Sequence, residues 1–371
     1  MYLLIMISIA IHSCYIGSKV VVSLLALDLG ASQVVVGTIA ACYAIMPLAL
    51  GIYSGRLADT IGMRWPMLIG AFCTGAALVT GWLWPTLPGL FVVSLLMGAS
   101  FVFFNVSIQN LTGAFGRPED RARNFSLLSI GYSFSTFIGP TFAGFSIDYS
   151  GHAATFGFFA LLTLLPIGIL IFNRSLTEVS VPAAAGKERS ALALLRDPPL
   201  QRLIIISGLT VAANDLYAFY LPIYGHEAGH SASTIGLILG SYALAAFLTR
   251  FALPVLMRRL RADQVMVAFM LIAASAFVFL PMTQQATSLM ALSFVIGLGL
   301  GCAQPVMMSL CYEKSPAGRT GEVTGLRLTA NNVARVVVPL LSGALGAGLG
   351  AAPVFWFNAM NLLAVSYLSR K

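Results

Sequence analysis

The chain has 371 residues, of which 58% are hydrophobic and only 9% are charged, and its mean hydropathy is +0.89. Because a soluble domain carries roughly 25% charged residues, this chain has too few polar side chains to cover a water-exposed surface, and most of its outer surface is expected to face lipid. The formal charge of +8 is small for this length and does not argue for a nucleic-acid partner.

Apolar stretches long enough to cross a bilayer, which takes ~20 residues per helix, recur along the whole chain. They are separated by short polar loops or by loops that contain Pro or Gly. The sequence therefore predicts an all-α membrane protein with twelve transmembrane helices. In chain order, the predicted spans are 3–27, 33–54, 66–84, 88–113, 124–147, 153–172, 200–223, 233–256, 264–282, 286–311, 322–347 and 352–369.

The distribution of Lys and Arg orients these spans, because cytoplasmic loops of membrane proteins carry the positive charges. With a cytoplasmic N-terminus, all loop Lys and Arg fall on the cytoplasmic side, together with Arg202 at the cytoplasmic end of its span. The four cations that remain lie inside predicted spans: Lys19, Arg250, Arg327 and Arg335. We therefore predict a multi-pass protein of the inner (plasma) membrane with both termini in the cytoplasm.

An internal repeat divides the chain. At a constant offset of 199 residues, Tyr43 aligns with Tyr242, Gly98 with Gly297, and Pro140 with Pro339. We expect two pseudo-symmetric six-helix bundles, at residues 1–172 and 200–371, joined by a cytoplasmic linker at 173–199. Parallel repeats of this kind place a transported solute near the middle of the membrane, between the halves.

The loop after the second predicted span reads GRLADTIGMR, from Gly55 to Arg64. Its glycines permit a tight turn, and its carboxylate, Asp59, can meet the positive N-terminal end of a neighbouring helix. The segment resembles the signature G-x-L-A-D-r-x-G-r-r of the major facilitator superfamily, although Thr60 and Met63 stand at positions that are usually basic.

The resemblance implies a secondary active transporter that works by alternating access. It also implies that the loop is a conformational latch between the halves, formed by Gly55, Asp59, Gly62 and Arg64 and meeting the chain near Gly321. The implied partners are a small-molecule substrate, the lipid bilayer and a coupling proton. No nucleotide-binding motif is present, and we expect no cofactor. We also expect a monomer with no resident metal.

The fifth predicted span contains Gly131, Gly139, Pro140 and Gly144. This pattern loosely resembles the glycine-rich "motif C" of exporters and antiporters in the same superfamily, and simple helix packing is the alternative. The fourth span lacks the Arg that accompanies antiport in the family, because Ser94 occupies that position.

Polar side chains inside spans of both halves are the candidates for a central site, because ionisable groups in lipid usually face a cavity or a partner. Asp215 and His12 are candidates for proton coupling. Lys19 and Asp215 could form an ion pair, and Arg335 has no obvious carboxylate partner in its own span. Arg327 could either face the cavity or extend to the membrane surface. The predicted substrate-binding residues are Tyr15, Lys19, Asn105, Gln109, Asn214, Gln304, Asn331 and Arg335.

The surplus of cations over carboxylates in the spans favours an anionic or amphiphilic organic solute. Proton-coupled efflux of such a solute is the favoured function, and proton-coupled import of a carboxylate is the alternative. A different class, an intramembrane metallohydrolase, is suggested by the HExxH pattern of His226, Glu227 and His230. Pro222 and Gly229 argue against the helix which that chemistry needs, and we expect no enzyme.

Overall fold

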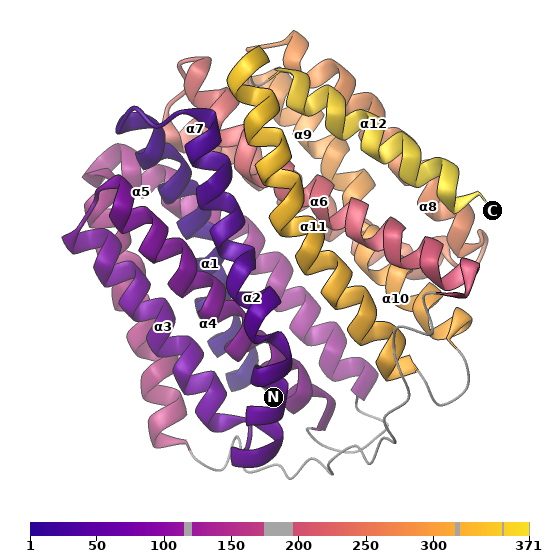
Figure 1. Ribbon diagram of the computed structural model, residues 1–371, viewed down its shortest axis with the longest axis horizontal. Coiled ribbons are helices and arrows are strands. Elements are labelled where there is room, and N and C mark those ends of the chain that lie inside the picture. Colours follow the sequence, from indigo (N-terminus) through magenta and orange to yellow (C-terminus); the bar gives the residue numbers. More distant parts are fainter. Residues whose placement is uncertain (115–120, 174–195, 316–319, 351, 371) are drawn as a thin grey trace. The chain divides into compact units, whose positions relative to one another are not determined.

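The computed structural model describes residues 1–114, 121–173, 196–315, 320–350 and 352–370, and the regular structure in these ranges is helical (Figure 1). The first half of the chain forms α1 (Tyr2–Asp28), α2 (Gln33–Ile61), α3 (Arg64–Leu83), α4 (Leu87–Ala114) and α5 (Arg121–Phe172). Within α5, Gly151 takes φ 82° and ψ 169°, a conformation that ends one helix and starts another. The two parts of α5 are the fifth and sixth predicted spans.

The helices of the second half follow the predicted spans as closely as those of the first half do. It forms α6 (Pro198–Glu227), α7 (Ala232–Leu256), α8 (Ala262–Phe279) with the short helix η4 (Leu280–Met282), α9 (Ala286–Gly301), α10 (Ala303–Lys314), α11 (Thr320–Leu349) and α12 (Ala352–Ser369). The tenth predicted span, 286–311, is divided at Cys302 into α9 and α10. The predicted all-α class is confirmed, and the predicted count of twelve spans is compatible with these helices.

Large apolar side chains are exposed on these helices, among them Phe172, Phe251 and Leu161 at 86%, 80% and 63% of their full accessibility. Within the described residues, nine helical stretches are long and apolar enough to cross a membrane, with α5 counted as a single stretch. An apolar outer surface on helices that satisfy their own backbone hydrogen bonds suits a lipid environment.

The chain forms two compact units, one of residues 1–185 with 231–237 and the other of residues 186–230 with 238–371. The predicted bundles differ from these units at one place, because the first turns of α7 group with the first unit. The reason lies at the turn before Gly151, where the Asp148 carboxylate accepts hydrogen bonds from the backbone amides of Ala232 and Ser233 at 3.0 and 2.8 Å. Residues 174–195 of the predicted linker lie outside the described ranges.

Inside the first unit, α1 runs along α5, and α4 packs against α2 and α3. Close approach of α1 and α5 depends on glycine, since a Cβ added at Gly139 would lie 2.7 Å from the carbonyl oxygen of Ser13. Gly131 faces the side chains of Ile5 and Ile9 of α1, whereas Gly144 abuts the backbone of Ala232. In lipid, where apolar contact alone does not drive helices together, such backbone-to-backbone packing holds a bundle together.

The repeat seen in the sequence has a structural counterpart in each unit. Gly30 and Gly229, equivalent at the 199-residue offset, take φ 76° and 77° and end α1 and α6 with the same turn. A Cβ at Gly98 would lie 2.7 Å from the carbonyl oxygen of Tyr43, and the equivalent Gly297 abuts the carbonyl of Tyr242. Within the second unit, α6 packs on α11 and α12, and α8 packs on α9 and α12.

Candidate functional site

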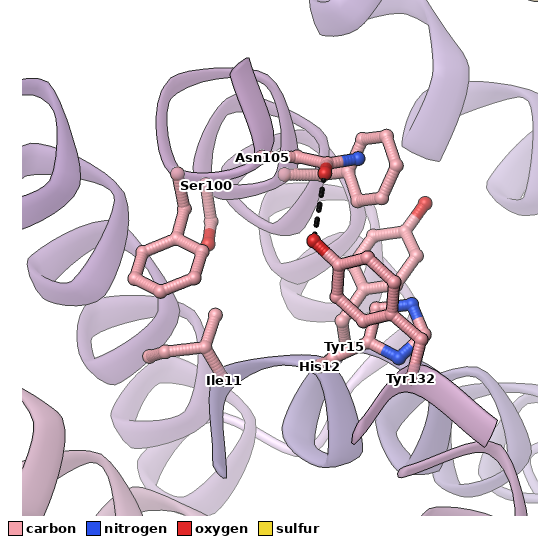
Figure 2. A pocket seen from close by; sticks show the side chains of 8 residues that line it. Ile11, His12, Tyr15, Ser100, Asn105 and Tyr132 are labelled. Carbon is pink, nitrogen blue, oxygen red and sulfur yellow. Dashed lines mark hydrogen bonds between the residues drawn. The ribbon is translucent and has the colours of Figure 1, made fainter. Parts of the chain in front are cut away.

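Each unit contains a group of polar side chains among apolar helices. In the first unit these side chains surround a pocket to which α1, α4 and α5 contribute. We call it the amide pocket, and Figure 2 shows it from close by. Its lining is formed by Ile11, His12, Tyr15, Ser100, Phe101, Phe104, Asn105 and Tyr132.

Aromatic rings make up most of the amide pocket. Tyr15 stacks on Phe101 with ring centroids 4.7 Å apart, and His12 lies 4.6 Å from the ring of Tyr132 in a tilted arrangement. His12 and Tyr15 are neighbours on one face of α1, as their spacing of three residues requires. The half-buried rings of His12, Phe101 and Tyr132 therefore offer π faces beside the pocket, against which a flat organic group can lie.

A hydrogen-bonded amide joins α4 to α5 in this pocket. The Tyr132 hydroxyl donates to Asn105 Oδ1 at 3.0 Å, and Gln109 Nε2 donates to the same oxygen at 2.8 Å. Asn105 and Gln109 are four residues apart on α4, which is why their side chains meet. Two predicted substrate-binding residues are thus linked to each other and to Tyr132, which the sequence did not single out.

Lys19 lies one turn further along α1 and is only 6% exposed. Its ammonium is 5.0 Å from the ring centroid of Tyr15 and 5.7 Å from that of Tyr43, within the range of cation–π attraction. The Tyr43 hydroxyl is in turn hydrogen-bonded to Ser18 at 3.1 Å. The aromatic rings of α1 and α2 therefore help to hold a positive charge inside the first unit.

In the second unit, an ion pair joins α6 to α11. Arg335 Nε donates to Asp215 Oδ2 at 2.8 Å, and the Asp215 side chain is 10% exposed while that of Arg335 is 27% exposed. The carboxylate that Arg335 lacks in its own span is therefore supplied by a neighbouring helix. The predicted pair of Lys19 and Asp215 would join the two units, and it stays a prediction.

A second polar group follows the same two helices. Ser207 of α6 donates to Asn331 Oδ1 at 2.9 Å and accepts from Arg327 Nη1 at 3.3 Å. Arg327 is 3% exposed and its Nη2 also contacts Met308 Sδ, so the side chain lies inside the unit and does not extend to its surface. Of the two alternatives left open for Arg327, the structure shows the buried one.

The remaining predicted site residues are placed differently. Asn214, next to Asp215, accepts a short hydrogen bond from the Tyr242 hydroxyl of α7. Gln304 is exposed on α10 and makes no hydrogen bond with any residue that the structure describes. The signal that could have found Tyr132 is the repeat, because Tyr132 and Asn331 are equivalent at the 199-residue offset.

The predicted latch is in part corrected by the structure. α2 continues to Ile61, so Gly55 is helical and forms no turn, and only Gly62 takes a positive φ, of 82°. Arg64 donates to the carbonyl oxygens of Leu170 and Ile171 at 3.0 and 2.9 Å, which caps the end of α5 within the first unit. The side chain of Asp59 lies outside what the structure describes, so its part in a latch stays a prediction.

The HExxH pattern does not form a metal site of the expected geometry. α6 ends at Glu227, and Gly229 takes φ 77°, so His226 and His230 do not share a helical face. His230 Nε2 is instead 2.6 Å from the carbonyl oxygen of Gln284. No group of three or more candidate metal ligands occurs among the described residues.

Comparison with known proteins agrees with the fold. The family model described as "Major Facilitator Superfamily" matches residues 2–339, nearly the whole chain. The chain belongs to the Major Facilitator Superfamily. It is therefore a multi-pass membrane transporter of that superfamily and not an enzyme.

Relatives of this superfamily member span almost its full length at low identity. An uncharacterized MFS-type transporter of Methanocaldococcus jannaschii is 22% identical over 361 residues, which cover 94% of this chain and 92% of the relative. The quinolone resistance protein NorA of Staphylococcus aureus is 23% identical over 354 residues, which cover 91% and 87%.

Solved structures of superfamily members share the fold. The nucleoside transporter NupG superposes with a TM-score of 0.81 at 14% identity, over 99% of this chain and 98% of that one. A POT family transporter in complex with a thioalcohol-conjugated peptide gives the same TM-score at 16% identity, over 98% and 94%. At such identities the likeness shows the fold alone.

Proposed function

We propose that this transporter exports a small amphiphilic organic compound in exchange for protons, by alternating access. The observation that carries the proposal is the ion pair between Asp215 and Arg335, which places a titratable carboxylate among membrane helices. Ionisable groups in such positions mark ion and proton pathways. The relative NorA, named for quinolone resistance, supports export of an organic compound.

The ion pair also determines which substrates could be exchanged for protons. A compound whose polar or cationic group contacts Asp215 competes with a proton for the carboxylate, so that binding releases the proton. Because linkage is reciprocal, protonation at the opposite side of the membrane then releases the compound. With an inward proton gradient, this competition drives export.

An anion would have the opposite effect, and Arg335 is the observation that favours this second candidate. A substrate carboxylate that pairs with the Arg335 guanidinium would remove the positive charge that stabilises the ionised form of Asp215. Asp215 would then take up a proton together with the anion. Such joint binding drives import of a carboxylate, the second function that the sequence leaves open.

The first experiment follows protons during binding. The purified protein is mixed, in weak buffer with a pH indicator, with an amphiphilic cation or with an aromatic carboxylate, and each compound is tested on the wild type and on Asp215→Asn. At a pH at which part of the Asp215 carboxyl is protonated, export predicts proton release with the amphiphilic cation, and the release is lost in the variant.

Proton uptake with the carboxylate, lost in the same variant, would replace export by import. Proton changes that are equal in the wild type and in Asp215→Asn would contradict Asp215 as the coupling group. In proteoliposomes with an imposed pH gradient, a compound whose binding releases protons should move opposite to the proton flow. A compound whose binding takes up protons should move in the same direction as the protons. A matched control is Asp263→Asn, because the Asp263 side chain is 37% exposed and pairs with Arg261 at the first turn of α8.

A further inference from the structure

The amide pocket contains an asymmetry that the aromatic rings do not explain. Asn105 Oδ1 accepts two hydrogen bonds, one from Tyr132 and one from Gln109, so both lone pairs of that oxygen are used. Figure 2 shows the amide oxygen directed at the Tyr132 hydroxyl and the amide nitrogen on the other side of the group. Among the described residues, none accepts a hydrogen bond from Asn105 Nδ2.

In the structure both donors meet the amide oxygen. If the Asn105 amide alone were rotated by half a turn, its nitrogen would face Gln109 Nε2, and two donor groups would oppose each other. In this arrangement the nitrogen, with its two N–H donors, is the group of Asn105 that remains for a further partner. The hydroxyl of Ser100, also in the lining, is hydrogen-bonded to Thr74 and to no group of the pocket.

The size of the pocket limits what can meet this donor. The space it encloses is about 10 Å³, roughly what one water molecule needs and far too little for an aromatic ring. The lining rings of Tyr15, Phe101, His12 and Tyr132 occupy the rest. A ligand can therefore place one oxygen-sized group in the pocket, while its flat body lies outside the pocket against the half-buried rings of His12, Phe101 and Tyr132.

We propose that Asn105 Nδ2 binds one carbonyl-type oxygen of the transported compound, and that Tyr132 and Gln109 are positioning residues that keep the amide in the donating orientation. The recognised class is a flat aromatic compound with a neutral hydrogen-bond acceptor attached to its ring. This inference rests on the proposed function in that it takes the amide pocket as part of the substrate path. It does not depend on how protons are coupled.

The recognition has a physical basis in the cost of leaving a half-buried polar group without a partner once a bound compound has displaced water from it. A site built to hydrogen-bond one substrate atom discriminates against an analogue that lacks the atom, because the amide then stays unpaired. A single hydrogen bond of this kind in a largely apolar site corresponds to about a tenfold difference in affinity. An analogue of equal shape isolates that difference from the contribution of ring stacking.

The test therefore uses two compounds that differ in one atom group, 2-acetylnaphthalene and 2-isopropenylnaphthalene, in which a CH₂ replaces the carbonyl oxygen. Dissociation constants are measured on the purified protein in detergent at constant, mildly alkaline pH. We expect the wild type to bind the ketone about tenfold more tightly than the alkene. In Asn105→Asp, which still accepts from Tyr132 and Gln109 but offers no donor, this preference should vanish while the alkene binds as before.

Tyr132→Phe tests the positioning role separately. Without the hydroxyl, one of the two bonds that orient the amide is lost, and the preference for the ketone should fall severalfold without a matching loss of alkene binding. Tyr224→Phe is the matched control, because its hydroxyl is bonded to the carbonyl oxygens of Pro281 and Thr283 in the second unit. It should keep the full preference.

Equal binding of ketone and alkene by the wild type, or no binding of either, would overturn the inference without any variant being made. So would a preference that survives in Asn105→Asp. Because no proton movement is measured, failure here is distinct from failure of the proton-exchange experiment.

Discussion

Asp215 and Arg335 are 120 positions apart in the chain, and their contact places two opposite charges between α6 and α11. A buried charge whose partner is removed is destabilising, because it keeps the cost of desolvation and loses the attraction that offsets it. The Asp215 side chain is nearly buried, whereas the Arg335 side chain is more than a quarter exposed and is therefore only partly desolvated. The cost of breaking this pair should therefore lie below that of a fully buried one.

We predict that Asp215→Asn lowers the free energy of unfolding by about 1–3 kcal/mol, less than the 3–5 kcal/mol typical of fully buried pairs. The double variant with Arg335→Gln should recover part of the loss, because neither charge then remains. Chemical or thermal unfolding in detergent measures both.

The matched control for this pair is Asp263→Asn, since the pair of Asp263 with Arg261 is exposed and should contribute no more than ~0.5 kcal/mol. A single variant at Asp215 that is as stable as the wild type would show that the pair does not stabilise the second unit.

At the scale of the element, glycine determines where helices end and where they approach each other. α9 ends at Gly301 after the run Gly297, Gly299 and Gly301, residues that lower helix propensity, so the tenth predicted span becomes two helices. Gly151 interrupts α5 by its positive φ. Three residues before it, the Asp148 side chain caps the start of α7.

We predict that Asp148→Ala destabilises the start of α7 by about 0.5–1 kcal/mol, because the variant loses an acceptor for two free amides and a negative charge at the positive end of a helix. Asp148→Asn, which keeps one side-chain oxygen as an acceptor, should lose less. Hydrogen exchange of the amides of Ala232 and Ser233 reports the change at the cap itself.

The pH dependence of this cap follows from the pKa of Asp148, which lies in the turn outside both predicted spans of α5. Burial alone would raise the pKa, but hydrogen bonds from Ser233, Ala232 and Ser231 outweigh it and hold the pKa below its ordinary value of 3.8. A carboxyl with a lowered pKa stabilises the folded state above its ordinary pKa, and the contribution is lost as the pH falls through the folded value. The difference between wild type and Asp148→Ala should thus be constant from about pH 5 to 8 and shrink progressively as the pH falls below about 5. A difference that changed near neutral pH would point to another titrating group.

At the scale of the whole molecule, the sidedness of the loops is a prediction from charge. Arg258, Arg259 and Arg261 lie between α7 and α8, whereas the connection from η4 to α9, at Thr283–Gln285, carries no Lys or Arg. Positive loops are retained in the cytoplasm.

We predict that a single cysteine placed at Arg259 is protected from a membrane-impermeant thiol reagent in intact cells, and that one placed at Gln284 is labelled. The five native cysteines would first be replaced. Labelling after the membrane is opened serves as the control for both positions. Reagent access to Arg259 in intact cells would reverse the predicted orientation.

The spans were predictable from the sequence because the signal is local. A bilayer requires a run of apolar residues of a set length, and every run from Tyr2 to Ser369 can be read without knowing which helix lies beside it. The equivalent turns of the repeat also depend on local conformation, since the glycines at 30 and 229 each end a helix through their own backbone conformation. Gly55 was wrongly placed in a turn because a glycine is tolerated in a helix as well as in a turn, and only the continued helix of α2 decides between them.

The sequence by itself determined that this chain spans the membrane and that it repeats, and it supplied candidate polar side chains within the spans. Only the tertiary structure decided which side chains contact each other. These contacts are Asp215 with Arg335, Tyr132 and Gln109 with one oxygen of Asn105, and Asp148 with the start of α7. The physical reason is that a long side chain reaches several neighbours, and its partner depends on how each helix is rotated about its axis. That rotation is set by packing between residues that are distant in the chain, at places such as Gly139 against Ser13, and it leaves no trace in a local pattern.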